Sequence, residues 1–427
     1  MKKIMLLLTR KYPYSFGEPF LENELPKHVP YYDKILVLSQ DVSKGEEATR
    51  VLPGGVEAVI TATSSRNKLR RQDVFRLLPS FLLGNERIRK ERQSRKVNVV
   101  QKMFLCYLDA RCQRLIREAQ GATSNIDFKQ YEQITIYSYW FFANAVVAVA
   151  LKKYLREKLN FRGRIVLISR AHRYDIYEEA NSIKYLPFRK FLLDEIDYVF
   201  PCSQDGTEYL HRKYFKTKAK IETAYLGTKD YGLSSASQSG VFHLVSCSRV
   251  VKVKGLERLI DALAQLKIDQ YKVLWTHIGG GVEGKNRYFD FIQSYAKRKL
   301  ENISFEFLGS MPNEKVYEYY KQSKIDVFVN VSYSEGLPVS LMEASSFGIP
   351  VIATDVGGSK EIIVENHNGY LLETGFTSKC LAKIIQDLME MPAEEIAKKR
   401  TFARNLWEQK YNAERNYKEF ASRVSEL

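Results

Sequence analysis

Short apolar runs alternate with polar turns and helical stretches along most of the chain. In the last third, residues 325–331 form one such run, and a helical stretch follows that begins near Pro338 and ends at Gly348. Proline is favoured at the first position of a helix and glycine just after the last. A second apolar run, 350–354, comes next. Runs this short and continuous are typical of strands buried on both faces of a parallel sheet.

The same strand–helix alternation is predicted for the rest of the chain. Between residues 227 and 240 it is interrupted by a polar stretch with three glycines, which we interpret as a linker between two α/β domains. The first domain is predicted to span residues 1–230 and the second residues 241–405. Before the linker, strands are predicted at 4–9, 34–39, 56–60, 134–138, 164–169, 198–201 and 220–225.

Positive charge is concentrated in one part of the chain. The net charge is +16, and residues 66–117 hold fifteen Lys and Arg against four Asp and Glu. Within this segment a predicted helix combines Phe75, Leu78, Phe81 and Leu82 with Arg70, Arg71 and Arg76. This composition favours contact with an anionic membrane surface. The alternative is a helix docked on its own domain with its charges in water. No nucleic-acid-binding module is recognisable, so no nucleic acid partner is expected.

Cysteine usage and hydropathy indicate where the protein resides. The five cysteines are scattered and form no CxxC pair, which argues for a reducing compartment and against a metal site or a disulfide framework. The apolar run at residues 4–8 is too short for a signal peptide, and the run at 140–151 is too short to cross a bilayer. We therefore expect a cytoplasmic protein, or one peripheral on the inner face of the membrane.

Two carboxylates frame the turn after the strand at 325–331. Glu335 lies in the turn, and Glu343 follows eight positions later in the helix. Such turns place helix N-termini at the carboxyl edge of a parallel sheet, which suits an anionic ligand. A carboxylate there needs a hydroxyl donor, and sugar hydroxyls supply one. One glutamate for a ribose and one for a transferred sugar would fit a nucleotide-sugar. The spacing alone equally allows an ordinary turn residue and a solvated helix residue.

The surrounding sequence resembles a known family. The stretch from Glu335 to Glu343, followed by residues 344–354 and Gly357-Gly358, is similar to the glutamate-x7-glutamate signature of family 4 retaining glycosyltransferases. The resemblance implies the GT-B fold, an α/β architecture of two Rossmann-like doubly wound domains with the active site in the cleft between them. It also implies that a C-terminal helix, residues 406–427, packs back on the first domain.

The resemblance implies specific donor contacts. Arg249 and Lys254 match the arginine–lysine pair that holds the donor diphosphate, and two cations there can stabilise the leaving group without a metal. No Asp-x-Asp motif is present, so no metal and no cofactor are expected. The alternative is that Arg249 and Lys254 are ordinary surface charges at the start of a helix. Glu343 is expected to bind the ribose and Glu335 the donor sugar. Main-chain groups of the following positions are expected to assist: Gly336, Leu337, Val339 and Ser340 at the diphosphate, and Met311 at the base.

The first domain offers fewer matches to the family pattern. His172 follows a predicted strand and matches a histidine placed close to the donor sugar, with Asp175 shortly after it, although Arg173 stands where the family usually has glycine. Gly17, in the first strand–helix turn, is expected to border the cleft near the acceptor, and we count it among the binding positions.

The expected function is a retaining, metal-independent hexosyltransferase. It would move a sugar from a UDP- or GDP-linked donor to a hydroxyl of a glycan or a lipid-linked glycan, in cell-surface polysaccharide assembly. Catalysis is assigned to Glu335, His172, Arg249 and Lys254. Two alternatives stay open: a non-catalytic nucleotide-binding partner subunit of a glycosyltransferase complex, and a GT-B sugar-nucleotide epimerase.

Overall fold

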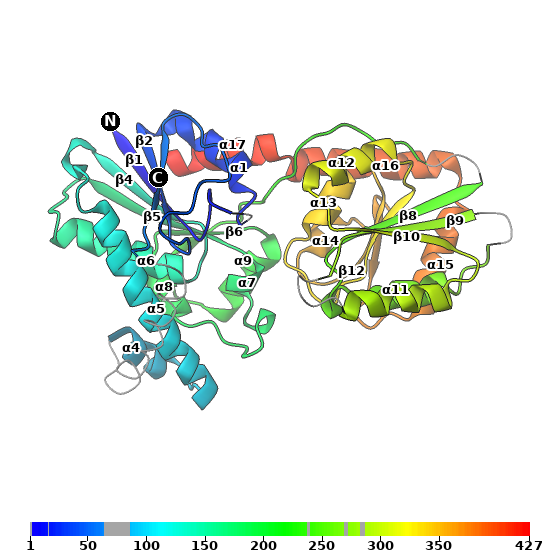
Figure 1. Ribbon diagram of the computed structural model, residues 1–427, viewed down its shortest axis with the longest axis horizontal. Coiled ribbons are helices and arrows are strands. Elements are labelled where there is room, and N and C mark those ends of the chain that lie inside the picture. Colours follow the sequence, from blue (N-terminus) through cyan, green and yellow to red (C-terminus); the bar gives the residue numbers. More distant parts are fainter. Residues whose placement is uncertain (1, 16, 64–85, 237–239, 269–271, 282–286) are drawn as a thin grey trace. The chain divides into compact units, whose positions relative to one another are not determined.

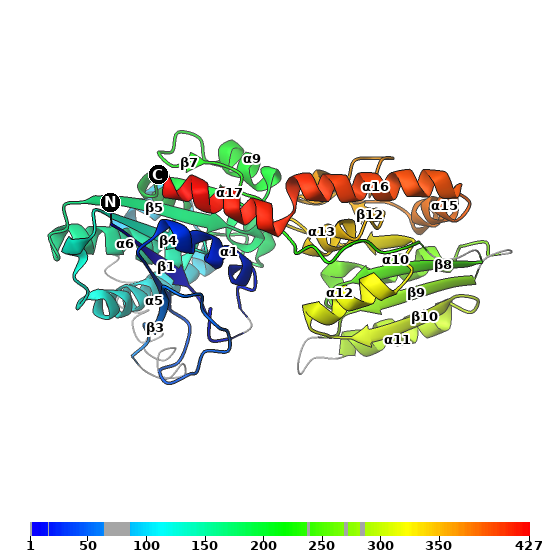
Figure 2. The ribbon, with the colours of Figure 1, turned by 90° about the horizontal axis from the view of Figure 1, so that it is seen from above.

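The computed structural model describes residues 2–15, 17–63, 86–236, 240–268, 272–281 and 287–427. The chain divides into two compact units (Figures 1 and 2). Unit 1 contains Met1–Tyr225 and Tyr417–Leu427, and unit 2 contains Leu226–Asn416. Each unit is a parallel sheet with helices on both faces.

The sheet of unit 1 has the strand order β3-β2-β1-β4-β5-β6-β7, and every neighbouring pair is parallel. Its strands are β1 (Lys3–Thr9), β2 (Lys34–Ser39), β3 (Val56–Ile60), β4 (Gln133–Ser138), β5 (Arg164–Ala171), β6 (Tyr198–Pro201) and β7 (Lys220–Ile221). Its helices are α1 (Leu21–His28), α4 (Glu86–Ser94), α5 (Val99–Thr123), α6 (Ala143–Glu157), α7 (Arg173–Ile176), α8 (Arg189–Glu195), α9 (Gln204–Lys213) and α17 (Ala413–Ser425).

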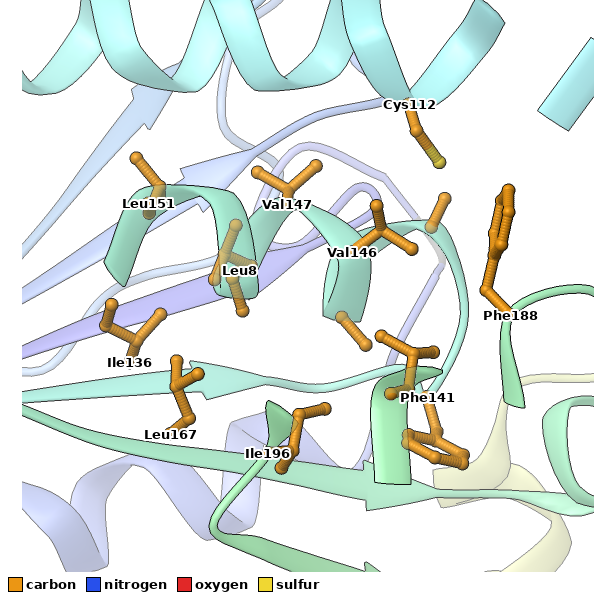
Figure 3. Close-up of a cluster of buried hydrophobic side chains, with 14 of the residues drawn as sticks. Leu8, Cys112, Ile136, Phe141, Val146, Val147, Leu151, Leu167, Phe188 and Ile196 are labelled. Carbon is orange, nitrogen blue, oxygen red and sulfur yellow. The ribbon is translucent and has the colours of Figure 1, made fainter. Parts of the chain in front are cut away.

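Alternating residues of β1 build the two cores of unit 1. Leu6 and Leu8 face a cluster formed with α5 and α6, whereas Met5 and Leu7 face a cluster formed with α1 and α17. Figure 3 shows the first cluster, in which Leu8 lies among side chains of α6 and the neighbouring strands. A strand buried on both faces must be apolar throughout, which is why residues 4–8 lack polar positions.

The sheet of unit 2 has the order β10-β9-β8-β11-β12-β13, again parallel throughout. Its strands are β8 (Val241–Cys247), β9 (Lys272–Ile278), β10 (Ser304–Gly309), β11 (Val327–Asn330), β12 (Val351–Thr354) and β13 (Gly369–Leu372). Its helices are α10 (Leu256–Leu263), α11 (Arg287–Lys299), α12 (Asn313–Gln322), α13 (Val339–Ser346), α14 (Ser359–Ile362), α15 (Ser378–Met389) and α16 (Ala393–Lys410). The predicted pair of Rossmann-like doubly wound domains is confirmed.

The C-terminal region differs from the single helix predicted from residue 406. Helix α16 ends at Lys410, and α17 begins at Ala413. The Asn412 side chain accepts a hydrogen bond of 2.9 Å from the Glu414 N–H, so it caps the new helix. Phe420 and Val424 of α17 then join the core of unit 1.

The basic segment is only partly described. The predicted amphipathic helix with Arg70, Arg71 and Arg76 lies outside the described residues. Farther along, four arginines in α4, in α5 or just after α4 form ion pairs within unit 1: Arg87 with Asp109, Arg95 with Glu178, Arg111 with Asp41, and Arg114 with Glu118. Among the described helices, none is long and apolar enough to cross a membrane.

Candidate functional site

In unit 2 the sheet changes its winding direction between β8 and β11. The chain leaves β8 toward β9 and leaves β11 toward β12, on opposite sides, so the turns after these two strands face each other at the carboxyl edge. The Tyr333 N–H donates to the Val253 carbonyl at 2.8 Å, which joins the two turns. Gly255 has φ +63°, and a Cβ there would lie 2.6 Å from the Val331 oxygen, so this close approach requires glycine. Ligands of doubly wound sheets bind at such a switch point.

Lys254 and Glu335 meet across this switch point. The Lys254 Nζ lies 2.6 Å from Glu335 Oε1, and Asn330 Nδ2 donates to the same oxygen at 3.2 Å. Both side chains are largely buried, with 21% and 11% of their surface exposed. No described residue donates to the other oxygen, Oε2. The structure therefore leaves one oxygen of Glu335 available to a hydroxyl.

Arg249 occupies the same turn as Lys254 but has a different environment. It lies two positions after the end of β8 and is exposed. Its guanidinium forms no ion pair with any residue in the described part of the chain. The predicted cation pair thus consists of a lysine paired with Glu335 and an exposed arginine.

Main-chain donors surround Glu335. The Gly336 and Leu337 N–H groups have no acceptor among the described residues, and no side chain caps α13. Val339 and Ser340 open this helix, where N–H groups lack intrahelical acceptors and the helix dipole is positive. The Gly358 N–H donates to the Gly336 carbonyl at 2.5 Å, which fixes the turn from below. The turn can hold an anion.

Glu343 lies one turn farther into α13 and is almost fully buried. Tyr317 of α12 donates its hydroxyl to Glu343 Oε1 at 2.8 Å, and burial raises the pKa of Glu343 to about 7. The Tyr317 ring stacks on Tyr231 with 4.4 Å between centroids. The sequence interpretation missed both tyrosines, because only the packing of α12 beside α13 reveals them.

Met311 follows β10, two strands away from β8, and is half-buried. Its position at the same carboxyl edge is compatible with the predicted contact to a base. That contact remains a prediction.

In unit 1 the corresponding switch point, between β1 and β4, is filled by Glu18. Its carboxylate accepts hydrogen bonds of 2.7–2.9 Å from the N–H groups of Arg10, Lys11 and Tyr12 and one of 2.8 Å from Trp140 Nε1. The protein's own acid therefore occupies the main-chain donors of this turn. The Gly17 carbonyl accepts from Arg50 Nη1 at 2.6 Å, so its main chain is also engaged.

His172 follows β5 and packs between Tyr139 and Trp140, with ring centroids 5.0 and 4.8 Å away. Burial, followed by the charge of Arg170, lowers the pKa of His172 to about 4, so the ring is neutral at pH 7. Its Nε2 lies 3.2 Å from the Tyr139 carbonyl, and an oxygen that can only accept requires the proton on Nε2. The Nδ1 atom is therefore an acceptor.

Asp175 is fully buried and does not reach the surface. Its two oxygens accept from the His172 N–H at 2.5 Å and the Phe141 N–H at 2.7 Å. Asp175 fixes the main chain around His172, and it is a positioning residue at most.

Comparison with known proteins identifies similar sequences. Residues 234–405 match the family model described as glycosyl transferases group 1. The chain is 26% identical over 280 residues to the putative colanic acid biosynthesis glycosyltransferase WcaL of Escherichia coli K12, covering 64% of this chain and 67% of that protein. It is 26% identical over 183 residues to the UDP-N-acetylglucosamine–peptide N-acetylglucosaminyltransferase GtfA subunit of Streptococcus pneumoniae, covering 42% of this chain and 34% of that protein. The amylovoran biosynthesis glycosyltransferase AmsK of Erwinia amylovora is 28% identical over 158 residues, covering 36% of this chain and 37% of that protein.

Solved structures with the same fold cover the whole chain. Anabaena HepE in complex with UDP and glucose has a TM-score of 0.65 at 18% identity, covering 100% of both chains. Sucrose-phosphate synthase of Thermosynechococcus elongatus has a TM-score of 0.68 at 16% identity, covering 100% of this chain and 99% of that one. These neighbours are GT-B glycosyltransferases, so the expected GT-B fold is confirmed.

Proposed function

We propose, from the group 1 glycosyl transferase match over residues 234–405 and the geometry of unit 2, that this protein is a retaining glycosyltransferase. The comparisons support the coarser assignment, a group 1 glycosyltransferase related to enzymes of polysaccharide biosynthesis. We further propose that it transfers a hexose from a UDP- or GDP-linked donor to a hydroxyl of a glycan or lipid-linked glycan, without a metal. Two similar proteins carry UDP in their structures, which supports a nucleotide-sugar donor.

One observation carries the proposal: the Lys254–Glu335 pair at the switch point. It lies beside the N–H groups of Gly336 and Leu337, which find no acceptor in the described part of the chain. In this account the N–H groups and Lys254 hold the diphosphate, with Arg249 closing on it from the surface. Negative charge grows on the diphosphate as the bond to the sugar breaks, and preorganised donors and cations stabilise it most at that stage.

Glu335 would act on the sugar. Its free Oε2 accepts a hydroxyl of the donor sugar, and its charge favours the positive, oxocarbenium-like sugar of the transition state. The salt bridge through Oε1 holds the carboxylate in place, and hydrogen bonds from neutral donors alone would do so less firmly.

The other predicted site residues would bind the rest of the donor and the acceptor. Glu343 accepts ribose hydroxyls, and the main chain at Met311 borders the base. On unit 1, we propose that His172 lies close to the donor sugar and that Gly17 lies near the acceptor.

Variants of the turn after β8 test whether Lys254 binds the donor diphosphate. We first screen nucleotide-sugars by thermal shift and then measure UDP and GDP binding by calorimetry. Lys254→Ala should weaken diphosphate binding by about 10- to 100-fold, the equivalent of hydrogen bonds to a charged group. The control is Lys252→Ala, an exposed lysine two residues earlier, which should bind normally.

Equal binding by Lys254→Ala and the wild type would remove Lys254 from the site. Nucleotide binding without turnover of any donor would favour the non-catalytic partner subunit, and interconversion of free sugar nucleotides without an acceptor would favour the epimerase.

A further inference from the structure

A series of buried hydrogen bonds joins β8 and β9 next to the turn that follows β8. Trp275 and His277 of β9 are two positions apart, so their side chains lie on the same face of the sheet, and His277 pairs with Ser246 of β8 in the strand register. Trp275 belongs to the hydrophobic core of unit 2. Trp275 and His277 are fully buried, and Ser246 is nearly so. Buried polar groups cost stability unless they are hydrogen-bonded, so each polar atom here needs a partner.

The donors and acceptors of this series have one consistent arrangement. His277 Nε2 lies 3.1 Å from the Ser248 carbonyl oxygen, which can only accept, so the proton is on Nε2 and Nδ1 is an acceptor. The Ser246 hydroxyl lies 2.8 Å from Nδ1 and therefore donates to it, and Ser246 Oγ accepts from Trp275 Nε1 at 3.0 Å. Burial lowers the pKa of His277 to about 4, so its ring is neutral at pH 7.

Packing keeps the His277 ring in this orientation. Its centroid lies 6.2 Å from that of the Trp275 ring and 5.6 Å from that of the Phe307 ring on β10. Residues that bind or react must be held to within about 0.5 Å by packing and hydrogen bonds behind them. A buried ring with fixed neighbours can provide such support to the main chain that it contacts.

The contact of His277 lies at the start of the turn that carries the two predicted cations. Ser248 directly follows β8, Arg249 is the next residue, and Lys254 lies six positions after Ser248. The Ser248 carbonyl belongs to the peptide that joins Ser248 to Arg249. A displacement of this peptide would therefore move Arg249 directly and change the course of the chain toward Lys254.

We propose that His277 is a positioning residue of the donor site, and that its hydrogen bond to the Ser248 carbonyl sets where Arg249 and Lys254 meet the diphosphate. This inference rests on the proposed function, because a bound diphosphate gives the turn its role. The His277 ring is fully buried, so it acts through Ser248 and not by contact with the donor. The affinity for the diphosphate should therefore depend on His277, whereas the affinity for the nucleoside should not.

Two substitutions separate the two nitrogens of the His277 ring. The amide nitrogen of glutamine can lie near the position of His277 Nε2, so His277→Gln keeps a donor for the Ser248 carbonyl. Asparagine is one methylene shorter and reaches the Ser246 side, so His277→Asn loses that donor. Both variants are polar and replace a buried ring, and a difference between them reports the bond to Ser248.

The first measurement is calorimetry of the full chain with UDP and GDP, and with uridine and guanosine by competition. His277→Asn should weaken binding of the nucleoside diphosphate by about tenfold, less than the full loss of a charged donor, and leave nucleoside binding unchanged. His277→Gln should bind both as the wild type does.

The second measurement needs no ligand. The Val250 N–H donates to the Gly280 carbonyl at 2.9 Å, so its hydrogen exchange reports the position of the turn. In the free protein, exchange in a peptide covering residues 248–255 should be about tenfold faster in His277→Asn than in His277→Gln.

His243→Asn is the matched control, because His243 is a buried histidine of the same sheet. Its Nδ1 lies 3.0 Å from the Lys324 carbonyl and its Nε2 lies 3.0 Å from Thr276 Oγ1, so it contacts other parts of unit 2. This variant should lose stability, yet bind UDP or GDP and exchange at residues 248–255 as the wild type does.

Four outcomes would overturn the proposal. The first is wild-type affinity and exchange in His277→Asn, and the second is an equal loss in His277→Gln, which would make His277 a packing residue. The third is an equal loss in His243→Asn, and the fourth is a loss of nucleoside affinity as large as that for the diphosphate. A wild type that binds neither UDP nor GDP would contradict the proposed donor site, and the exchange comparison would still decide whether His277 holds the turn.

Discussion

At the scale of single residues, the partners of the two glutamates decide what each can do. Glu335 shares Oε1 with Lys254 and Asn330, whereas Glu343 is buried against Tyr317. The sequence could place Glu335 in the turn and Glu343 in the helix that follows it, because Pro338 marks where that helix begins. It could not show Tyr317, which comes from another helix, or the buried setting that raises the pKa of Glu343.

That pKa predicts a proton linked to nucleotide binding. With its pKa raised to about 7 by burial, Glu343 is mostly protonated at pH 6.5. An ionised carboxylate accepts two ribose hydroxyls better than a protonated one. Binding of UDP should therefore release up to about 0.7 proton at pH 6.5 and tighten as the pH rises from 6 to 8. Calorimetry in buffers of different ionisation enthalpy measures this release.

Glu343→Gln is the control for that measurement, because it keeps an acceptor for Tyr317 and removes the titration. The phosphate of UDP titrates in both proteins, so the difference between them isolates residue 343. An identical proton release in wild type and variant would show that Glu343 does not ionise on binding.

The raised pKa of Glu343 also makes the stability of the folded protein depend on pH. The folded protein holds the Glu343 proton between about pH 4.5 and 7, where the unfolded chain has released it. The contribution of this group to stability is therefore complete below pH 4.5 and is lost as the pH rises to 7. A buried carboxyl that costs stability at neutral pH is typical of functional sites.

At the scale of elements, glycines bring neighbouring turns together at the sheet edge. Gly357 has φ +55°, and a Cβ there would lie 2.3 Å from the Glu335 carbonyl oxygen. The turn before α14 thus packs directly under the turn that carries Glu335. The sequence indicated a Gly357-Gly358 turn, but only the structure shows which main-chain atoms it approaches.

Gly357→Ala should therefore distort the Glu335 turn. A strained left-handed residue together with a main-chain clash should cost about 1–3 kcal/mol and lower the melting temperature by about 2–12 °C. UDP binding should weaken in the remaining folded protein. Gly375→Ala is the matched control, because a Cβ at Gly375 meets nothing within 4 Å. Equal melting temperatures and UDP affinities for the two variants would contradict this account of the turn.

Element boundaries show where sequence patterns are sufficient. The apolar runs placed most strands well, since parallel strands buried on both faces leave a clear pattern. The run predicted at 220–225 was too long, because β7 contains only Lys220–Ile221. The prediction of a single terminal helix was wrong. The chain passes from α16 to α17 through Tyr411 and Asn412, and this junction contains no glycine or proline that would mark a helix end in the sequence. The sequence analysis also missed the hydrogen bonds of Glu18 to the main-chain N–H groups of the turn after β1. In a sequence, a carboxylate with this role cannot be told from an ordinary surface charge.

At the scale of the whole molecule, the fold could be predicted but the use of its surface could not. A net charge of +16 suggests a polyanionic partner, yet at least four arginines of residues 66–117 pair within unit 1. Eleven surplus charges exceed what those pairs neutralise. We therefore keep the proposal that the protein acts at an anionic membrane surface, peripheral on the cytoplasmic side.

Flotation with liposomes tests this proposal. Each basic residue near an anionic leaflet contributes about 1 kcal/mol, and salt screens it. The protein should float with anionic vesicles at low salt, remain behind with neutral ones, and dissociate at high salt. Charge reversal at Arg70, Arg71 and Arg76 should reduce binding, whereas reversal at Lys379, on α15 of unit 2, should not. Failure to float with either vesicle would leave the segment a solvated part of unit 1.

The central claim is sugar transfer with retention, without a metal, at the Lys254–Glu335 turn. Its most direct test needs no acceptor, because glycosyltransferases hydrolyse donors slowly when water replaces the acceptor. Proton NMR of the first sugar released from an α-linked UDP- or GDP-sugar, in the presence of EDTA, reads the anomer before it mutarotates. The account predicts the α anomer first, and a rate reduced in Lys254→Ala but not in Lys252→Ala. Release of the β anomer first, or release only with a divalent metal, would contradict it.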